Sequence, residues 1–408
     1  MPSIGDTLRA ARLSQGWTQA QAGAQAGFSA AAISRIERGQ AVDIDTLRRL
    51  AHCYRIPPEQ LGLTTVNPHA ATIGEDVDRR QLLATAGLTI PAWVLTRLDD
   101  ALAVLPEPTN PPSPATVTAR LAAGRHLFDT GNHTQLVATL PDLLAAAHQL
   151  GDTGDTEHYA TVASCYELAT HALSKIGRHP SSRLTADRAM TYAQLSGSPE
   201  AVALSSRALS IVLRHEGRPQ LAQRVNQTAI TDLEATGLTN ATQRAVYIQM
   251  MCSTAYATAQ AGDRAAALEW AKEADRALPG LTERRTQPAT PVNATALTPA
   301  QVQLYKVGMY WALGDSAAAL ESARGLRPEQ FPTPERRARL HTDLARAWWQ
   351  HGRPEQTALA LIAAHRQAPA EVTDRPGIRR IAATVTDRHP QASGVRELHA
   401  ILLSRGLA

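Results

Sequence analysis

The chain has 408 residues, of which 44% are hydrophobic and only 4% aromatic, and its formal net charge at pH 7 is +4. This length allows two or more domains, and the alanine-rich composition is typical of helical proteins. The small net charge is weak evidence about nucleic acid, and no apolar run reaches the roughly 18 to 20 residues of a membrane-spanning helix. We therefore expect an all-α protein of the cytoplasm that has no membrane partner.

The first predicted helix is the amphipathic segment Ile4–Ser14. A second helix follows, in which Thr18 caps the first turn and Gln21, three residues later, closes a capping box. Gly27 supplies the left-handed residue that ends this helix. Inside it, Gly23 costs about 0.5 to 1 kcal/mol relative to alanine, so we expect a close approach of two helices there.

The third predicted helix begins at Ser29 and ends at Gly39. Ile33 and Ile36 lie three residues apart on an inward, apolar face. The outward-facing residues are Ser29, Ala30, Ala31, Ser34, Arg35 and Arg38. Two such helices joined by a tight turn have the shape that enters a DNA major groove, with a plain helical bundle as the alternative.

A fourth helix is predicted to start at Asp45, with Leu47, Leu50, Ala51 and Tyr54 at helical spacing, and Pro57 and Pro58 open a short fifth. This five-helix unit, residues 1–63, resembles the XRE family of lambda-repressor-like helix-turn-helix domains. The residues that carry the resemblance are Gln19, Gly27, Ile33, Ser34, Ile36, Glu37, Gly39 and Leu47.

The resemblance implies a double-stranded DNA operator, with a phosphate contact from Gln19 and base edges facing Ser29, Ala30, Ala31, Ser34 and Arg35. Of these, Arg35 has the chemistry for a bidentate pair with guanine, whereas the alanines offer only contact with a thymine methyl group. Arg38 lies beyond the apolar face and is predicted to contact phosphate.

Residues 64–115 are predicted to be a connector with helices at Glu75–Ala86 and Trp93–Leu105, followed by a proline run from Pro106 to Pro114 that we expect to be non-helical. Beyond it, residues 116–374 repeat a glycine turn between alanine-rich helical stretches. The six turns are at Gly131, Gly177, Gly217, Gly262, Gly314 and Gly352. A recurring turn of this kind indicates a helical repeat.

The clearest unit, Gly262 to Pro279, has small residues at Ala267, Ala271 and Ala274 and resembles the second half of a tetratricopeptide repeat. The resemblance predicts a right-handed solenoid of six hairpins, in which the first helices line a concave groove. Residues 375–408, with helices near Ile378–Arg388 and Val395–Arg405, are expected to cap its open end, and Leu281–Pro299 is expected to be a loop.

The glycine turns set the register and so predict which side chains face the groove. They are Arg125, Phe128, Glu167, His171, Lys175, Arg207, Arg214, Tyr256, Gln260, Trp311, Arg346 and Trp349. This basic and aromatic set suits a carboxylate or phosphate clamped by arginine, with apolar contacts to tryptophan. The alternative for each residue is an ordinary solvated or interhelical side chain.

A repressor-like domain joined to such repeats resembles the bacterial peptide-pheromone receptors of quorum sensing and actinobacterial regulators of secondary metabolism. The resemblance implies a homodimeric transcription regulator whose groove senses an effector. No asparagine falls at the predicted groove positions, which disfavours a peptide, and a small acidic metabolite or a protein partner remains open. The alternative function is a DNA-tethered scaffold whose repeats bind another protein without a small effector.

An enzyme is not expected, because the chain has no dinucleotide-binding, P-loop, nucleophile-elbow or zinc-protease motif. Cys53, Cys165 and Cys252 are widely spaced and lack metal-ligand partners, so we expect free thiols and neither a metal nor another cofactor. The acidic group around Asp155 is interpreted as a helix cap.

Overall fold

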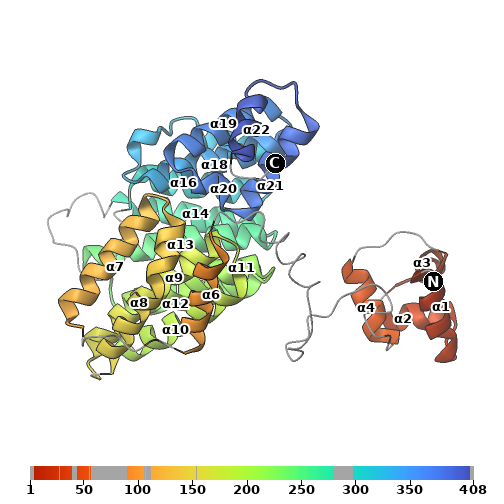
Figure 1. The fold of residues 1–408 in the computed structure, drawn as a ribbon, viewed down its shortest axis with the longest axis horizontal. Helices are drawn as coiled ribbons and strands as arrows, with labels where there is room; N and C mark the ends of the chain where they lie inside the picture. The colour runs from red at the N-terminus through yellow and green to blue at the C-terminus, as the bar shows by residue number, and fades with distance from the viewer. Residues whose placement is uncertain are drawn as a thin grey trace. The chain divides into compact units, whose positions relative to one another are not determined.

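The computed structural model describes residues 4–26, 28–38, 44–54, 56, 90–104, 106, 112–152, 154–279 and 297–404. Over these residues all regular secondary structure is helical, so the predicted fold class is confirmed. The chain divides into two compact units, Met1–Val77 and Asp78–Ala408 (Figure 1). The predicted fifth helix, the helix expected at 75–86 and residues 281–296 of the loop expected at Leu281–Pro299 lie outside the described residues, as do Gly27 and Gly39. Pro299 itself is the first residue of a helix, which corrects the end of that loop.

The N-terminal unit contains α1 (Ile4–Ser14), α2 (Gln19–Ala26), α3 (Ala30–Glu37) and α4 (Ile44–Tyr54). Its core includes Leu8, Ile33, Ile36, Leu47 and Leu50, so the predicted apolar faces are the buried ones. The start of α4 is a correction, because this helix begins at Ile44 and Asp45 lies inside it.

The second unit is built from six helical hairpins. They are α7 (Pro114–Asp129) with α8 (His133–Gly151), α9 (Thr156–Lys175) with α10 (His179–Ser196), α11 (Pro199–His215) with α12 (Pro219–Ala235), α13 (Ala241–Gln260) with α14 (Arg264–Ala277), α16 (Pro299–Ala312) with α17 (Ser316–Ala323), and α18 (Pro334–Gln350) with α19 (Pro354–Gln367). Each predicted turn glycine has a positive φ, between 71° and 87°. All six predicted turns are therefore confirmed, because glycine is the residue that adopts this conformation without strain.

The predicted connector contributes to the helical unit. Helix α6 (Ala92–Ala103), expected at Trp93–Leu105, buries Leu98 and Leu102 in one cluster with Leu140 of α8. At the end of the proline run, Pro114 is helical, which corrects the prediction. Ser113 caps α7 there, and proline fits the first helical turn because that turn has no intrahelical partner for its N–H groups.

The C-terminal part contains the short helices η2 (Pro328–Gln330) and α20 (Ala370–Thr373), followed by α21 (Pro376–Arg388) and α22 (Val395–Leu403). Helices α21 and α22 pack on α18 and α19 of the last hairpin, where the sequence predicts capping helices, and the chain around them also meets the first hairpins. A Cβ built on Gly131 would lie 3.0 Å from the Cβ of Ala368, and one built on Gly177 would lie 2.7 Å from Cγ of Pro376.

Helix α7 also contacts α18, so the first hairpins touch the last ones (Figure 1). The six hairpins therefore close on themselves. Glu371 and Asp374, which precede the predicted capping segment, pair with Lys175 of α9 and His133 of α8 and so join the two ends of the array.

Candidate functional site

The outward face of α3 is presented as the sequence predicts. Ser29 is the N-cap, and its Oγ accepts a hydrogen bond of 3.2 Å from the Ala32 backbone N–H. Ser34 is half-buried. The exposed members of the predicted DNA-binding set are Ser29, Ala30, Ala31, Arg35 and Arg38. Helix α2 is also fixed as predicted, because Thr18 and Gln21 exchange both hydrogen bonds of the capping box.

A buried ion pair holds the end of α3 against α1. The Arg12 guanidinium donates to both Glu37 oxygens, at 2.6 and 3.1 Å, and the Gln19 side-chain amide donates to Glu37 at 2.9 Å. Burial alone would raise the pKa of Glu37, but the hydrogen bonds from Arg12 and Gln19 outweigh this and lower it. Gln19 therefore positions α3, a role that the sequence did not indicate, and its phosphate contact stays a prediction.

Two glycines allow the helices of this unit to approach closely. A Cβ on Gly23 would lie 2.4 Å from the Phe28 carbonyl oxygen, and one on Gly5 would lie 2.6 Å from the Glu37 carbonyl oxygen. Gly23 thus lies close to the turn that follows its own helix, and not to a second helix as the sequence predicts. It packs α2 directly against the turn that leads into α3.

In the helical unit, the first helices of all six hairpins surround a cavity of about 310 Å³. Eight of the twelve predicted groove residues line this cavity. They are Phe128, His171, Lys175, Arg207, Arg214, Tyr256, Gln260 and Arg346. The structure brings these side chains together, and effector binding by them stays a prediction.

The other four predicted groove residues are not among those that line the cavity. Glu167 is buried and accepts a 2.7 Å hydrogen bond from Ser205, and burial raises its pKa to about 7. Arg125 lies near this carboxyl, and burial lowers the pKa of Arg125 despite the attraction of Glu167. Both belong to the packing between neighbouring hairpins.

The two tryptophans face other parts of the helical unit. The Arg346 guanidinium carbon lies 4.9 Å from the centroid of the Trp311 ring. Trp349 packs against the cluster formed by α19, α21 and α22, with its ring centroid 6.1 Å from that of His389. Neither tryptophan lines the cavity, because each faces a neighbouring element.

Sequence reasoning missed several cavity residues on α16, α18 and the start of α21. They are Gln301, Tyr305, Glu335, Arg336, Arg339, Asp343 and Arg375. A signal was present on α18, because Arg336, Arg339, Asp343 and Arg346 recur at intervals of three or four residues and so share one helix face.

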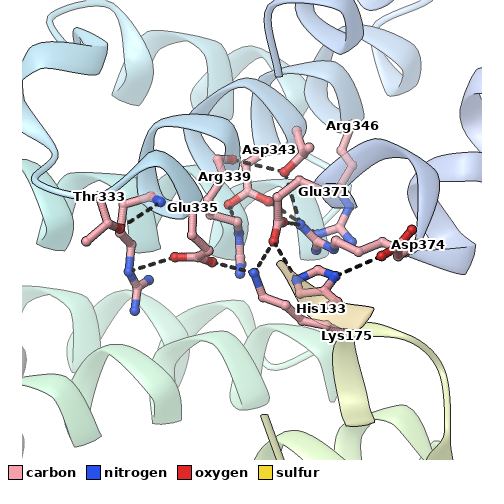
Figure 2. Close-up of polar contacts among 12 residues, drawn as sticks. His133, Lys175, Thr333, Glu335, Arg339, Asp343, Arg346, Glu371 and Asp374 are labelled. Carbon is pink, nitrogen blue, oxygen red and sulfur yellow. Dashed lines mark hydrogen bonds and ion pairs between the residues drawn. The ribbon is translucent and has the colours of Figure 1, made fainter. Parts of the chain in front are cut away.

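Two cavity-lining arginines of α18 are paired with a carboxylate of the same helix. Asp343 accepts from Arg339 Nε at 2.6 Å and from Arg346 Nη1 at 3.2 Å (Figure 2). Burial alone would lower the pKa of Arg339, but the Asp343 carboxylate outweighs this and raises it. One buried carboxylate is thus shared by two guanidinium groups.

A second polar group joins the first hairpins to the last ones, and we call it the closure cluster. Its members are His133, Lys175, Glu335, Glu371, Asp374 and Arg375. Figure 2 shows the Lys175 ammonium between the carboxylates of Glu335, at 2.6 Å, and Glu371. Arg375 donates to Glu371 at 2.8 Å.

His133 Nδ1 of the same cluster lies 3.1 Å from Asp374 Oδ2. Burial alone would raise the pKa values of Glu335 and Glu371, but Lys175 and the nearby arginines outweigh this and lower both. The carboxylates are therefore ionised at neutral pH, and the cluster is a network of opposite charges that ties residues far apart in the chain.

Aromatic rings complete the cavity. The Arg214 guanidinium carbon lies 4.5 Å from the Tyr256 ring centroid, and Tyr256 itself lies against α16 because Gly308 leaves room for it. Arg207 Nη2 donates to the Tyr305 hydroxyl at 3.0 Å. Burial, followed by the charges of Arg207 and other cations, lowers the pKa of His171 to about 3, so this imidazole is neutral.

Within the described ranges, no group of three or more His, Cys, Asp or Glu side chains is arranged to hold a metal ion, and no helix is long and apolar enough to cross a bilayer. Cys165 and Cys252 are free and buried, and burial raises the pKa of each thiol to about 12. Asp155 caps α9 through the Glu157 backbone N–H, as predicted.

Residues 3–62 match a family model described as a helix-turn-helix domain. The comparison with curated proteins found no match. Among solved structures, the chain is similar to PlcR of Bacillus thuringiensis, solved in complex with the peptide PapR7 and DNA, at 13% identity and a TM-score of 0.31, over 89% of this chain and 99% of that one. The family match and the helices described above show an N-terminal helix-turn-helix domain, followed in this chain by a closed array of helical hairpins.

Proposed function

We propose that this protein is a sequence-specific, DNA-binding transcription regulator whose helical unit binds an effector in its cavity. The observation that carries the proposal is the exposed face of α3. Its Arg35 is exposed one turn beyond the capped start of the helix, while Ile33 and Ile36 are buried beneath.

The fixed position of α3 supports this role. Its N-terminus is capped by Ser29, and its last residue, Glu37, is held by Arg12 and Gln19. A recognition helix held at both ends enters a major groove with little loss of conformational freedom. Arg35 then pairs with guanine, and Arg38 contacts phosphate.

Selection of duplexes from a randomised pool with the full chain tests the DNA-binding part. On the selected site, Arg35→Ala is expected to cost about 1 to 3 kcal/mol and to relax the preference at one base pair. The matched variant Arg38→Ala should weaken binding to all sequences alike and reduce the salt slope by about one. No salt-sensitive retention of any duplex would refute the proposal, and an unchanged site preference in Arg35→Ala would refute the role of that residue.

The proposal includes a homodimer. In dimeric helix-turn-helix regulators, the two recognition helices read half-sites about 34 to 36 Å apart, and we expect the same spacing here. An effector would act by favouring one arrangement of the two DNA-binding domains. Footprinting should show two half-sites one helical turn apart, and light scattering should give twice the mass of one chain. A single protected half-site with a monomeric mass would contradict the dimer and leave the DNA-binding role intact.

The cavity supports effector binding, since its volume of about 310 Å³ falls at the small end of ligand pockets and its walls combine aromatic rings with several charged side chains. Thermal unfolding of the full chain with metabolite extracts tests this part. An extract component that raises the melting temperature should also change the affinity for the selected DNA site.

A further inference from the structure

The cavity carries a marked excess of positive charge. Its described lining contains seven lysine and arginine side chains, namely Lys175, Arg207, Arg214, Arg336, Arg339, Arg346 and Arg375, against the two carboxylates of Glu335 and Asp343. Glu371, which pairs with Lys175 and Arg375, adds one more. An enclosed surface with this balance favours an anion.

The excess is not spread evenly over the lining. Arg339 and Arg346 pair with Asp343, and Arg336 Nε lies 3.3 Å from Glu335. Lys175 and Arg375 pair within the closure cluster. Each of these five cations therefore has at least one carboxylate partner, and together they share the three carboxylates of Glu335, Asp343 and Glu371.

Arg207 and Arg214 differ from them, because neither forms an ion pair with a carboxylate in the part of the chain that the structure describes. Arg207 donates to the Tyr305 hydroxyl, and Arg214 lies over the Tyr256 ring. The Nε atoms of both are buried and make no hydrogen bond to described residues. A buried donor without an acceptor carries an unrecovered desolvation cost.

The surroundings of these two arginines also disfavour a hidden carboxylate partner. Burial, together with the charges of Arg207 and Arg339, outweighs the opposing effect of Tyr256 and lowers the pKa of Arg214 to about 10. Burial raises the pKa of Tyr305, but Arg207 and Arg336 outweigh this and lower it, so this part of the cavity favours negative charge. The nearby Glu167 is held by Ser205, and its raised pKa leaves it only partly ionised at pH 7.

We infer that Arg207 and Arg214 hold the anionic group of a small organic effector, a carboxylate or a phosphate. The two arginines are separated by seven residues, which is about 10 Å along one face of α11, with Ile211 between them. Guanidinium groups bind both anions through paired N–H donors, and the unused Nε atoms supply them. The apolar part of the effector would contact Ile211, Tyr256 and Tyr305. This inference rests on the proposed effector role of the cavity.

Calorimetric and thermal-shift titrations of the full chain with phosphate, phenyl phosphate and phenylacetate test the inference, with phenylacetamide as the uncharged match of phenylacetate. We expect the phenyl anions to bind and to raise the melting temperature, and phenylacetamide to do neither. Arg207→Gln and Arg214→Gln should each weaken anion binding by about tenfold, the effect of losing one charge-assisted hydrogen bond. Arg224→Gln, at an exposed position of α12, should leave it unchanged.

Failure of all three anions to bind, or equal weakening in Arg224→Gln, would overturn the inference. A second measurement does not depend on the probes. Without ligand, Arg214→Gln should melt at or above the wild-type temperature, because it removes a cation that lacks a partner, and a large drop would show that Arg214 is structural. Retention of the selected DNA site, measured on the same variants, separates a failure of this inference from a failure of the proposed regulator function.

Discussion

Two arginine-bearing faces of the same cavity differ in how their charges are compensated. The α18 face, formed by Arg336, Arg339, Asp343 and Arg346, contains its own carboxylate. The α11 face, formed by Arg207, Ile211 and Arg214, contains none. Both faces place long cationic side chains toward the interior, and the fully buried guanidinium Nε atoms without an acceptor among the described residues of the two faces are those of Arg207 and Arg214 on the α11 face.

The difference between the α18 and α11 faces shows that the number of positive charges alone does not locate an anion-binding site. A buried guanidinium with a carboxylate partner contributes to the stability of the fold, and removal of the partner is costly. A buried guanidinium without a carboxylate partner has lost its hydration and has no ion pair in exchange. It is therefore the group that gains the most free energy when an anionic ligand binds. Substitutions on the two faces should therefore have opposite effects on stability.

The largest effect is expected for Asp343→Ala. This change leaves Arg339 and Arg346 without an anionic partner, and breaking a buried pair costs about 3 to 5 kcal/mol. Urea unfolding followed by tryptophan fluorescence measures the loss. A change below about 1 kcal/mol would mean that the α18 arginines are solvated as freely as surface groups, and the contrast between the faces would fail.

The next largest loss in the free energy of unfolding, about 3 kcal/mol at pH 7, is expected for Lys175→Met in the closure cluster. This change removes the positive charge that lies between the carboxylates of Glu335 and Glu371. Their folded-state pKa values lie below the ordinary 4.5, so the stability that they contribute is present above pH 4.5 and is lost as the pH falls below it. The difference between wild type and variant should therefore stay nearly constant from pH 7 to about pH 5 and shrink as the pH is lowered from about 4.5 to 3. A constant difference would contradict the electrostatic origin.

Glu167→Gln should increase stability by about 1 to 2 kcal/mol at pH 8 and change little at pH 4. The folded-state pKa of Glu167, about 7, exceeds the ordinary 4.5, so the folded chain binds the proton more tightly and stability falls as the pH rises between these values. The groups that act on this carboxyl are Arg125 of α7 and Ser205 and Arg207 of α11. Glu157→Gln, at an exposed position of the same helix, is the control and should show no such pH dependence.

The smallest effect is expected for Gly308→Ala, about 1 kcal/mol. A Cβ at this position would lie 2.9 Å from Tyr256 Cε2, so the ring must move away from α16 and alter its contact with Arg214. The melting temperature and the anion affinity, measured on the same variant, would show whether anion binding by the α11 face depends on the Tyr256 ring. An unchanged affinity would assign the site to the guanidinium groups alone.

Local features of the sequence predicted local structure well. The capping box of Thr18 and Gln21 and the six turn glycines act over three to five residues, so their outcome does not depend on the rest of the fold. The glycine turns also fixed the register of the first helices. For this reason the sequence alone predicts that Arg207, Arg214 and Tyr256 lie on the inner face, and all three line the cavity.

Contacts between remote segments could not be predicted in the same way. Lys175 and Glu371 are separated by 196 residues, and no periodicity in the sequence relates them. Their meeting depends on the accumulated rotation of six hairpins, and so does the position of Tyr305 opposite Arg207. Trp311 and Trp349 were misplaced because they lie on the sides of their helices that pack against neighbouring elements.

Closure also fixes the number of hairpins. An open array of repeats gains or loses a unit with only local consequences, because each repeat contacts its neighbours alone. Here an inserted or deleted hairpin would separate Glu371 from Lys175 and Ala368 from Gly131. The number of hairpins in this array therefore cannot change by one without loss of the contacts between its two ends. The first and last hairpins stabilise each other through these contacts, so we expect neither end of the array to unfold before the other.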